Sequence, residues 1–204
     1  MHDFEPKTTQ DVLDLANGSG PDAPIDMKEE ILAEVFSMSK IIVVALICAM
    51  ILNFLVIVNA TVPTGSMEPT IRVNDRIVAF RLSYLFSSPD RYDIIVFRAP
   101  DDGVMNVKRV IALPGETVRI TGGVVYINGA SGLRDDFIRT GPMGYMGADF
   151  PEMLVPEGHF FVLGDYRGNS RDSRDWNNPF VEAGRIQGRA VFRYFPGFRN
   201  LRNS

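Results

Sequence analysis

Residues 41–58 read IIVVALICAMILNFLVIV, a run of eighteen residues with no charged side chain. At about 1.5 Å per residue, a helix over residues 41–62 would be roughly 33 Å long, which is enough to cross the hydrocarbon core of a bilayer. A helix buried in a protein core would usually carry a polar stripe, whereas this segment contains only Asn53. The sequence therefore predicts a transmembrane helix, which we place at residues 38–62.

A cleavable signal peptide is the alternative interpretation of this apolar run. It fits poorly, because forty residues precede the run and because the run is longer than the apolar region of a typical signal peptide. Pro63 cannot continue a helix comfortably and marks the exit from the span. We therefore expect a permanent anchor.

Charge is distributed unevenly on the two sides of the anchor. Residues 1–40 contain nine acidic residues and three lysines, whereas the rest of the chain has sixteen acidic and eighteen basic residues. Residues 1–37 are thus an acidic tail. Basic residues flank the span on both sides, so the positive-inside rule does not decide its orientation. No basic patch is interleaved with aromatic residues, which argues against a nucleic-acid partner.

The chain after Pro63 has the texture of a β protein. Short runs rich in β-branched and aromatic residues are separated by Gly, Pro, Asn and Asp. Residues 128–151, rich in Gly, Met and Asp, are predicted to form an irregular loop. We predict a mainly β protein, with an all-β domain of antiparallel sheets at residues 63–204 behind the single helix. The strand candidates are residues 76–80, 93–98, 107–113, 117–120, 124–127, 159–163 and 188–195.

Lys108 is the only lysine among the eighteen basic residues that follow position 40. A lysine can lose its proton when burial lowers its pKa, whereas arginine stays charged. In the predicted strand, alternation places Lys108 and Arg109 on opposite faces, so one of them must point toward an interior or a covered cleft. Most strand lysines are simply solvated, but a buried one could act as a general base.

A nucleophile for such a base is present in the segment PTGSMEPT, residues 63–70. Ser66 is a weak nucleophile unless a neighbouring base takes its proton. Histidine is the usual base, but His2 lies in the tail and His159 lies at a predicted strand start, where a surface position is expected. A Ser-His-Asp triad is therefore disfavoured. Cys48 lies within the span, so the large domain has no thiol for cysteine-based catalysis.

A third polar segment, GDYRGNSRDSRD at residues 164–175, is dense in groups that form hydrogen bonds and ion pairs. It does not fit a calcium-binding loop, because Arg167 stands where an EF-hand requires Asp or Asn. It could be a solvated turn or a polar scaffold beneath an active site. In the second case Ser170 could orient the lysine amine and Asp172 could pair with Arg174.

Four segments of the sequence, taken in order, resemble the signature blocks of bacterial type I signal peptidases. Each block is a modest signal alone, but the four occur in the family's order behind an anchor and span nearly all of residues 60–196. The blocks are Ser66–Thr70 (SMEPT), Tyr92–Phe97 (YDIIVF), Lys108–Glu116 (KRVIALPGE) and Gly164–Arg174 (GDYRGNSRDSR).

The resemblance implies a membrane-bound Ser/Lys endopeptidase that removes signal peptides from exported preproteins. It assigns Ser66 as the nucleophile and Lys108 as the general base. It further implies an oxyanion hole made by the Ser66 backbone N–H and the hydroxyl of Thr64, at a position where the family often has Ser. No metal ion or organic cofactor is expected.

The resemblance also implies roles for residues around the dyad. Ser170 would form a hydrogen bond with Lys108, and Asp172 and Arg174 would brace the site. Substrate would bind in an extended conformation as an added strand, with alanine at the first and third positions before the cut. The small apolar pockets would be lined by Val62, Met67, Ile71 and Val107.

The family resemblance predicts where this protein works. The tail would lie inside the cell and the peptidase domain on the extracytoplasmic side of the plasma membrane. The expected partners are signal peptides of secreted preproteins, the lipid bilayer and, by proximity, the secretion translocon. Tyr166 and Gly168 depart from the Asn and Asp common in the last block, which raises a question about local packing.

Two other functions compete with this one. Self-cleaving repressors are also Ser/Lys peptidases of a similar fold, but they are soluble, and the anchor argues against them. A non-catalytic, membrane-anchored β domain that binds exported proteins is the alternative from a different class. An inactive relative would be expected to lack Ser66 or Lys108, and both are present.

Overall fold

The computed structural model of the protein describes residues 9, 13, 27–130 and 137–202. The chain divides into two compact units, residues 1–50 and residues 51–204. Most of the predicted acidic tail, residues 1–37, lies outside the described residues.

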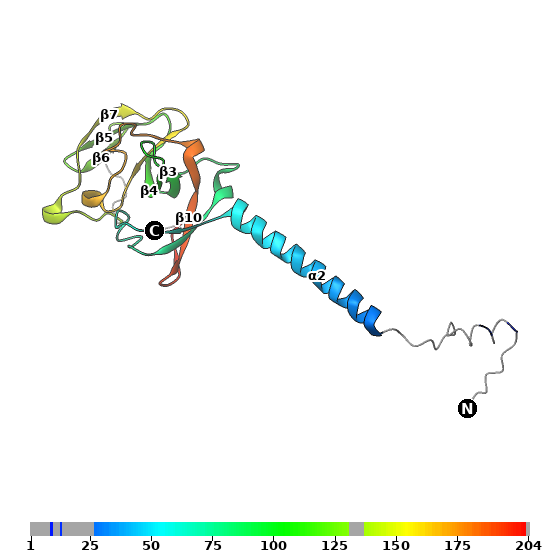
Figure 1. The fold of residues 1–204 in the computed structure, drawn as a ribbon. Coiled ribbons are helices and arrows are strands. Elements are labelled where there is room, and N and C mark those ends of the chain that lie inside the picture. The colour runs from blue at the N-terminus through cyan, green and yellow to red at the C-terminus, as the bar shows by residue number, and fades with distance from the viewer. Residues whose placement is uncertain (1–8, 10–12, 14–26, 131–136, 203–204) are drawn as a thin grey trace. The chain divides into compact units, whose positions relative to one another are not determined.

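The first unit is built on one long helix, α2, from Met27 to Ile51 (Figure 1). Its segment Glu34–Ile51 is long and apolar enough to cross a membrane, and no part of it is buried within the protein. An exposed apolar surface of this extent is unusual for a soluble monomer. The helix is therefore a candidate membrane span.

The prediction of a helix over residues 38–62 is wrong at its C-terminal end. Helix α2 ends at Ile51, a π-helical turn (η1) covers Leu52–Val56, and residues 57–61 form strand β1. Strand β1 pairs antiparallel with β2, Arg76–Phe80, over its whole length. Apolar β-branched residues suit either a helix or a strand, so only the pairing with β2 decides the structure.

The second unit contains a large antiparallel sheet. Its strand order is β1-β2-β10-β3-β4-β8-β9, with β11 paired to β10, and each of these pairings is antiparallel. The predicted fold class, mainly antiparallel β behind one N-terminal apolar helix, is confirmed. The remaining strands of this sheet are β3 (Ile94–Arg98), β4 (Met105–Ala112), β8 (His159–Leu163), β9 (Val181–Glu182), β10 (Ile186–Phe195) and β11 (Arg199–Asn200).

Helix is scarce in this unit. Between residues 57 and 202, in the part that the structure describes, helical structure is limited to single 3₁₀ turns. These short turns lie in connections between strands. They are η2 (Arg81–Tyr84), η3 (Pro142–Gly144), η4 (Arg167–Asn169) and η5 (Ala183–Arg185).

A smaller sheet has the strand order β6-β5-β7. Its strands are β5 (Thr117–Thr121), β6 (Val124–Ile127) and β7 (Phe150–Leu154). Strand β7 begins inside the stretch predicted as an irregular loop, residues 128–151. Only its first residue, Phe150, is buried, and Pro151 follows, so the strand lacks the alternation that identifies a half-buried strand.

Strand β3 is buried on both faces, and this holds the centre of the large sheet in place. Ile94 and Val96 pack into one core cluster, while Ile95 and Phe97 pack into another that includes Trp176. The alternation of strand side chains produces this division. The neighbouring strand β4, which carries Lys108, is thereby fixed against a densely packed support.

Candidate active site

Ser66 lies in a tight turn between β1 and β2. The Glu68 N–H donates to the Gly65 carbonyl at 3.0 Å, and the Ile71 N–H donates to the Met67 carbonyl at 2.9 Å. Met67 and Ile71 are fully buried and anchor the turn in the core. Ser66 itself is 8% exposed, so its hydroxyl lies at the edge of a covered site.

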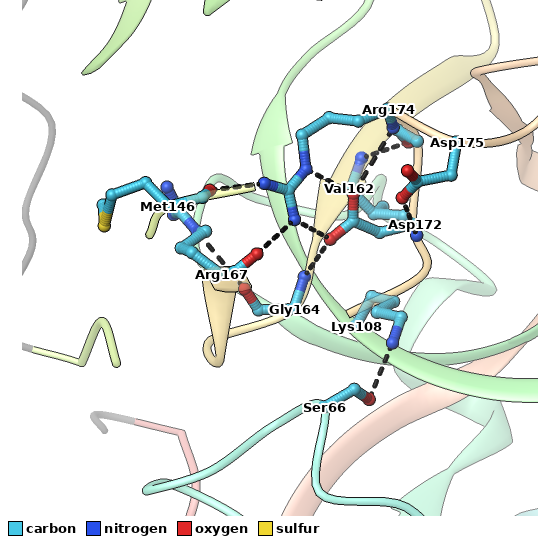
Figure 2. Close-up of polar contacts among 10 residues, drawn as sticks. Ser66, Lys108, Met146, Val162, Gly164, Arg167, Asp172, Arg174 and Asp175 are labelled. Atoms are coloured by element: carbon cyan, nitrogen blue, oxygen red, sulfur yellow. Dashed lines mark hydrogen bonds and ion pairs between the residues drawn. The ribbon is translucent and has the colours of Figure 1, made fainter. Parts of the chain in front are cut away.

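Lys108 lies beside this serine. Its Nζ donates a hydrogen bond to Ser66 Oγ at 2.7 Å, and its side chain reaches there from β4 (Figure 2). Burial lowers the pKa of Lys108 to about 8, although the nearby carboxylate of Asp172 acts in the opposite direction. The lowered pKa brings loss of the proton from this amine close to neutral pH, as a general base requires.

Thr64, the predicted oxyanion residue, is close to Ser66. Its Oγ1 lies 3.4 Å from Ser66 Oγ, and its side chain is exposed. A hydroxyl in this position can donate toward an oxygen that forms next to Ser66 Oγ.

Asp172 and Arg174 form a buried, two-point ion pair. Arg174 Nε donates to Asp172 Oδ1 and a second guanidinium nitrogen donates to Oδ2, each at 2.8 Å. Asp172 Oδ2 also accepts from the Gly164 N–H at 3.0 Å. Arg174 further donates to the carbonyls of Met146 and Arg167, so this one guanidinium ties the polar segment 164–175 together and connects it to Met146 (Figure 2).

The predicted hydrogen bond between Ser170 and Lys108 is not present. Within the part of the chain that the structure describes, the buried Oγ of Ser170 has no hydrogen-bond partner. Ser170 packs against Gly164, where an added Cβ would overlap Ser170 Oγ and lie 2.5 Å from the Ser66 carbonyl oxygen. The sequence brings Ser170 near the site but does not fix the direction of its short side chain.

Arg109, to which the sequence pattern assigned no role, is as buried as Lys108. Its guanidinium donates to both carboxylate oxygens of Asp165, at 2.8 and 2.6 Å, and lies 4.1 Å from the centroid of the Phe137 ring. The sequence contained part of the evidence for a buried Arg109, because alternation along β4 placed Lys108 and Arg109 on opposite faces and only Lys108 was given a role. Both bases are in fact covered, on opposite faces of the strand.

A cleft of about 160 Å³ opens beside Ser66. Of the four predicted pocket residues, Val62 and Val107 line it. The other two, Met67 and Ile71, do not line it; they are fully buried in the core, where they support the Ser66 turn. Residues that the sequence did not indicate also line the cleft, namely Ala60, Thr61, Val96, Val104, Met105 and Asn106.

The departures at Tyr166 and Gly168 have a common structural explanation. A Cβ at Gly168 would lie 2.5 Å from both the Gly141 nitrogen and the Tyr145 carbonyl oxygen, so glycine permits this segment to pack closely. The Tyr166 ring lies 4.3 Å beneath the guanidinium of Arg139. Tyr166 and Gly168 thus both pack against one segment, residues 139–145.

The residues around Ser66 suit nucleophilic catalysis by a serine and a neutral amine. Within the described ranges, no group of three or more His, Cys, Asp or Glu side chains gathers as a metal ion would require. The essential elements are the Ser66–Lys108 contact, the Thr64 hydroxyl and the adjoining apolar cleft.

Comparisons with known proteins point to one family. The family model described as signal peptidase, peptidase S26, matches residues 35–195. The probable signal peptidase I-1 of Synechocystis sp. is 40% identical over 167 residues, which cover 78% of this chain and 82% of that protein. The signal peptidase I of Leptolyngbya laminosa is 45% identical over 143 residues, covering 66% of this chain and 67% of the relative.

A solved structure is also similar. The crystal structure of a signal peptidase I from Enterococcus faecalis is 37% identical, with a TM-score of 0.44, and the match covers 50% of this chain and 97% of that one.

Proposed function

Because this chain belongs to the signal peptidase family S26, it is a serine endopeptidase that removes signal peptides from preproteins, and we propose that Ser66 and Lys108 are its catalytic dyad. The resemblance inferred from its sequence blocks is thus confirmed at the level of the family. One observation carries the proposal of the dyad: Lys108 Nζ lies 2.7 Å from Ser66 Oγ at a buried site.

In the first step, neutral Lys108 removes the hydroxyl proton of Ser66 as Oγ attacks the scissile carbonyl carbon. A C–O bond forms, the carbonyl π electrons move to oxygen, and Lys108 becomes an ammonium. The oxyanion of this tetrahedral intermediate would accept hydrogen bonds from the Ser66 N–H and the Thr64 hydroxyl. The 3.4 Å separation of Thr64 Oγ1 and Ser66 Oγ supports the role of Thr64.

In the second step, the Lys108 ammonium protonates the leaving amine as the C–N bond breaks. The mature protein departs and the signal peptide remains as an ester on Ser66. Lys108 is neutral again and can take a proton from a water molecule that attacks the ester. Release of the signal peptide then returns the proton to Ser66 Oγ.

Asp172 and Arg174 support the dyad without touching the reacting atoms. Their two-point ion pair is buried and joins the segments around Met146 and Arg167. The Asp172 carboxylate also opposes the lowering of the Lys108 pKa by burial. This opposition keeps the pKa of the base near the working pH.

The cleft beside Ser66 is proposed to hold the end of the signal peptide. Strand β1 is an edge strand of the large sheet, and residues 105–107 of β4 are paired with β3 but not with β8. These backbone edges can accept an extended peptide as an added strand. The small volume of the cleft and the apolar Val62 and Val107 in its lining favour alanine at the first and third positions before the cut.

Helix α2 is proposed to anchor the enzyme in the plasma membrane, with residues 1–37 inside the cell and residues 63–204 on the extracytoplasmic side. The exposed apolar surface of Glu34–Ile51 supports a span. Restriction of enzyme and preprotein to one membrane surface raises their effective concentration, and proximity to the translocon would extend this advantage.

Cleavage of a preprotein tests this proposal. The full chain in detergent micelles is incubated with a preprotein whose signal peptide ends in Ala-x-Ala, and Ser66→Ala and Lys108→Arg are compared with wild type. Wild type alone should cleave, because one variant lacks the nucleophile and the other has a base that stays protonated. Fluorescence of Trp176, the single tryptophan, confirms that each variant is folded. Cleavage by folded Ser66→Ala would refute the role of the dyad.

A further inference from the structure

The nucleophile turn is held from outside by a second ion pair that the dyad does not involve. Glu68, two residues after Ser66, pairs with Arg139. The carboxylate of Glu68 folds back over the turn, since a Cβ on Gly65 would lie only 3.2 Å from Glu68 Oε1. Arg139 therefore binds the turn that carries the nucleophile.

Arg139 is itself fixed to the polar segment beneath the active site. Its N–H donates to the Asp165 carbonyl and its carbonyl accepts from the Arg167 N–H, both at 2.8 Å. Its guanidinium lies 4.3 Å from the centroid of the Tyr166 ring. Backbone bonds and a cation–π contact thus hold the position of this side chain.

The same tyrosine contacts Ser66 directly through its backbone. The Tyr166 N–H donates to the Ser66 carbonyl at 3.0 Å. Ser66, Tyr166, Arg139 and Glu68 consequently form a closed ring of contacts, with the nucleophile at one corner. The turn is fixed at the Ser66 carbonyl and again at the Glu68 carboxylate.

We propose that Arg139 is a positioning residue for the nucleophile, which acts by joining Glu68 to Tyr166 and thereby holds Ser66 Oγ within reach of Lys108. This inference rests on the proposed roles of Ser66 and Lys108. The contacts of Arg139 are made to the turn and to the segment of Tyr166, so its effect on the reacting atoms is exerted through the turn.

Two features that build this ring are the departures from the family pattern noted in the sequence. Tyr166 stands where the family commonly has Asn, and an Asn side chain offers no aromatic face to a guanidinium. Gly168, the second departure, allows the segment that continues from Arg139 to approach closely, because a Cβ there would lie 2.5 Å from the Gly141 nitrogen. The two departures and the Glu68 pair therefore belong to one arrangement.

The exposure of the Arg139–Glu68 ion pair distinguishes a role in positioning Ser66 from a role in stabilising the fold. The side chains of Arg139 and Glu68 are 47% and 23% exposed, and ion pairs of this kind contribute little to stability. A displacement of a nucleophile by about 1 Å, in contrast, can reduce a rate by up to about a hundredfold. Loss of Arg139 should therefore change the rate far more than the melting temperature.

The test measures steady-state cleavage of the Ala-x-Ala preprotein by the full chain in detergent. Arg139→Gln should lower kcat by about tenfold while KM stays within about twofold. The midpoint of the pH–rate profile should not move, because the base is unchanged. Arg139→Lys, which retains the charge, should recover part of the lost kcat. If Trp176 fluorescence shows Arg139→Gln to be unfolded, Tyr166→Asn replaces it, with a loss of kcat in the same direction.

Two further variants sharpen the result. The double variant Glu68→Gln/Arg139→Gln should be no slower than Arg139→Gln, because the pair acts as a unit. Arg81→Gln, which removes an exposed arginine bonded to the neutral Gln187, should leave kcat unchanged.

The possible contrary results are distinct from one another. An unchanged kcat in folded Arg139→Gln, a loss confined to KM, a shifted pH midpoint or full additivity in the double variant would each overturn the role of Arg139. Failure of the dyad would be seen separately, as cleavage by Ser66→Ala.

Discussion

Replacing Lys108 by methionine should stabilise the protein, and by an amount that depends on pH. Lys108 is 2% exposed, and the cost of removing its ammonium from water outweighs the attraction of nearby carboxylates such as Asp172, because its pKa is lowered on balance. Methionine is of similar length and carries no charge. Lys108→Met should therefore abolish cleavage and, at neutral pH, raise the free energy of unfolding.

The lowered pKa of Lys108 sets the size of this change in the free energy of unfolding. Burial moves the pKa of Lys108 from 10.5 to about 8, so the unfolded chain binds more protons than the folded protein between these values. Wild-type stability accordingly rises with pH across this window. Each unit of pKa difference between the folded and unfolded states corresponds to about 1.4 kcal/mol. The destabilisation caused by Lys108 is therefore about 3 kcal/mol at pH 7 and about 1 kcal/mol at pH 10.

Chemical denaturation of the full chain in detergent, followed by Trp176 fluorescence, measures this difference. Wild type and Lys108→Met are compared at the same pH, so that other titrating groups contribute equally to both. The advantage of the variant should shrink by about 2 kcal/mol between pH 7 and pH 10. The variant also loses the hydrogen bond to Ser66, and this loss contributes to the difference at each pH.

Ser66→Ala is the matched control, because it removes that hydrogen bond and keeps the lysine. It should retain the pH dependence of wild type. Parallel stability curves for wild type and Lys108→Met between pH 7 and pH 10 would refute the reasoning, since they would mean that folding does not penalise the ammonium.

Further predictions concern the same site. For wild type, kcat/KM should rise with pH through a midpoint near 8, as Lys108 loses its proton, and a midpoint near 10.5 would contradict the lowered pKa. Asp172→Ala should lower the free energy of unfolding by about 3–5 kcal/mol, because it leaves the buried Arg174 guanidinium without its carboxylate; a loss below about 1 kcal/mol in denaturation would contradict this. Gly168→Ala should destabilise by about 1–3 kcal/mol, since its Cβ would meet the Gly141 nitrogen, and an unchanged denaturation midpoint would show that the segment can move aside.

The limits of the sequence are clearest at the anchor. Composition alone identified an uncharged apolar stretch long enough to span a bilayer, because the requirement is one of length and polarity. It did not locate the end of the helix. Residues 57–61 continue the uncharged run, and they form β1 because Arg76–Phe80 is available as a partner.

In the active site, too, the sequence predicted some features and not others. The residue types of Ser66, Lys108, Asp172 and Arg174 and the order of their segments were enough to propose a serine–lysine dyad and its supporting ion pair. The direction of the Ser170 side chain was not predicted, because a short hydroxyl side chain responds to the packing around it.

The sequence by itself determined the apolar stretch, the β class of the domain and the family, and it was enough to propose the two reacting groups, since each depends on residue type, local spacing or the order of motifs. Only the tertiary structure decided that Met67 and Ile71 belong to the core, that Arg109 pairs with Asp165, and that Arg139 reaches Glu68. The last two contacts join residues 56 and 71 positions apart. No local pattern encodes such a pairing, because it forms only when the fold brings distant segments together.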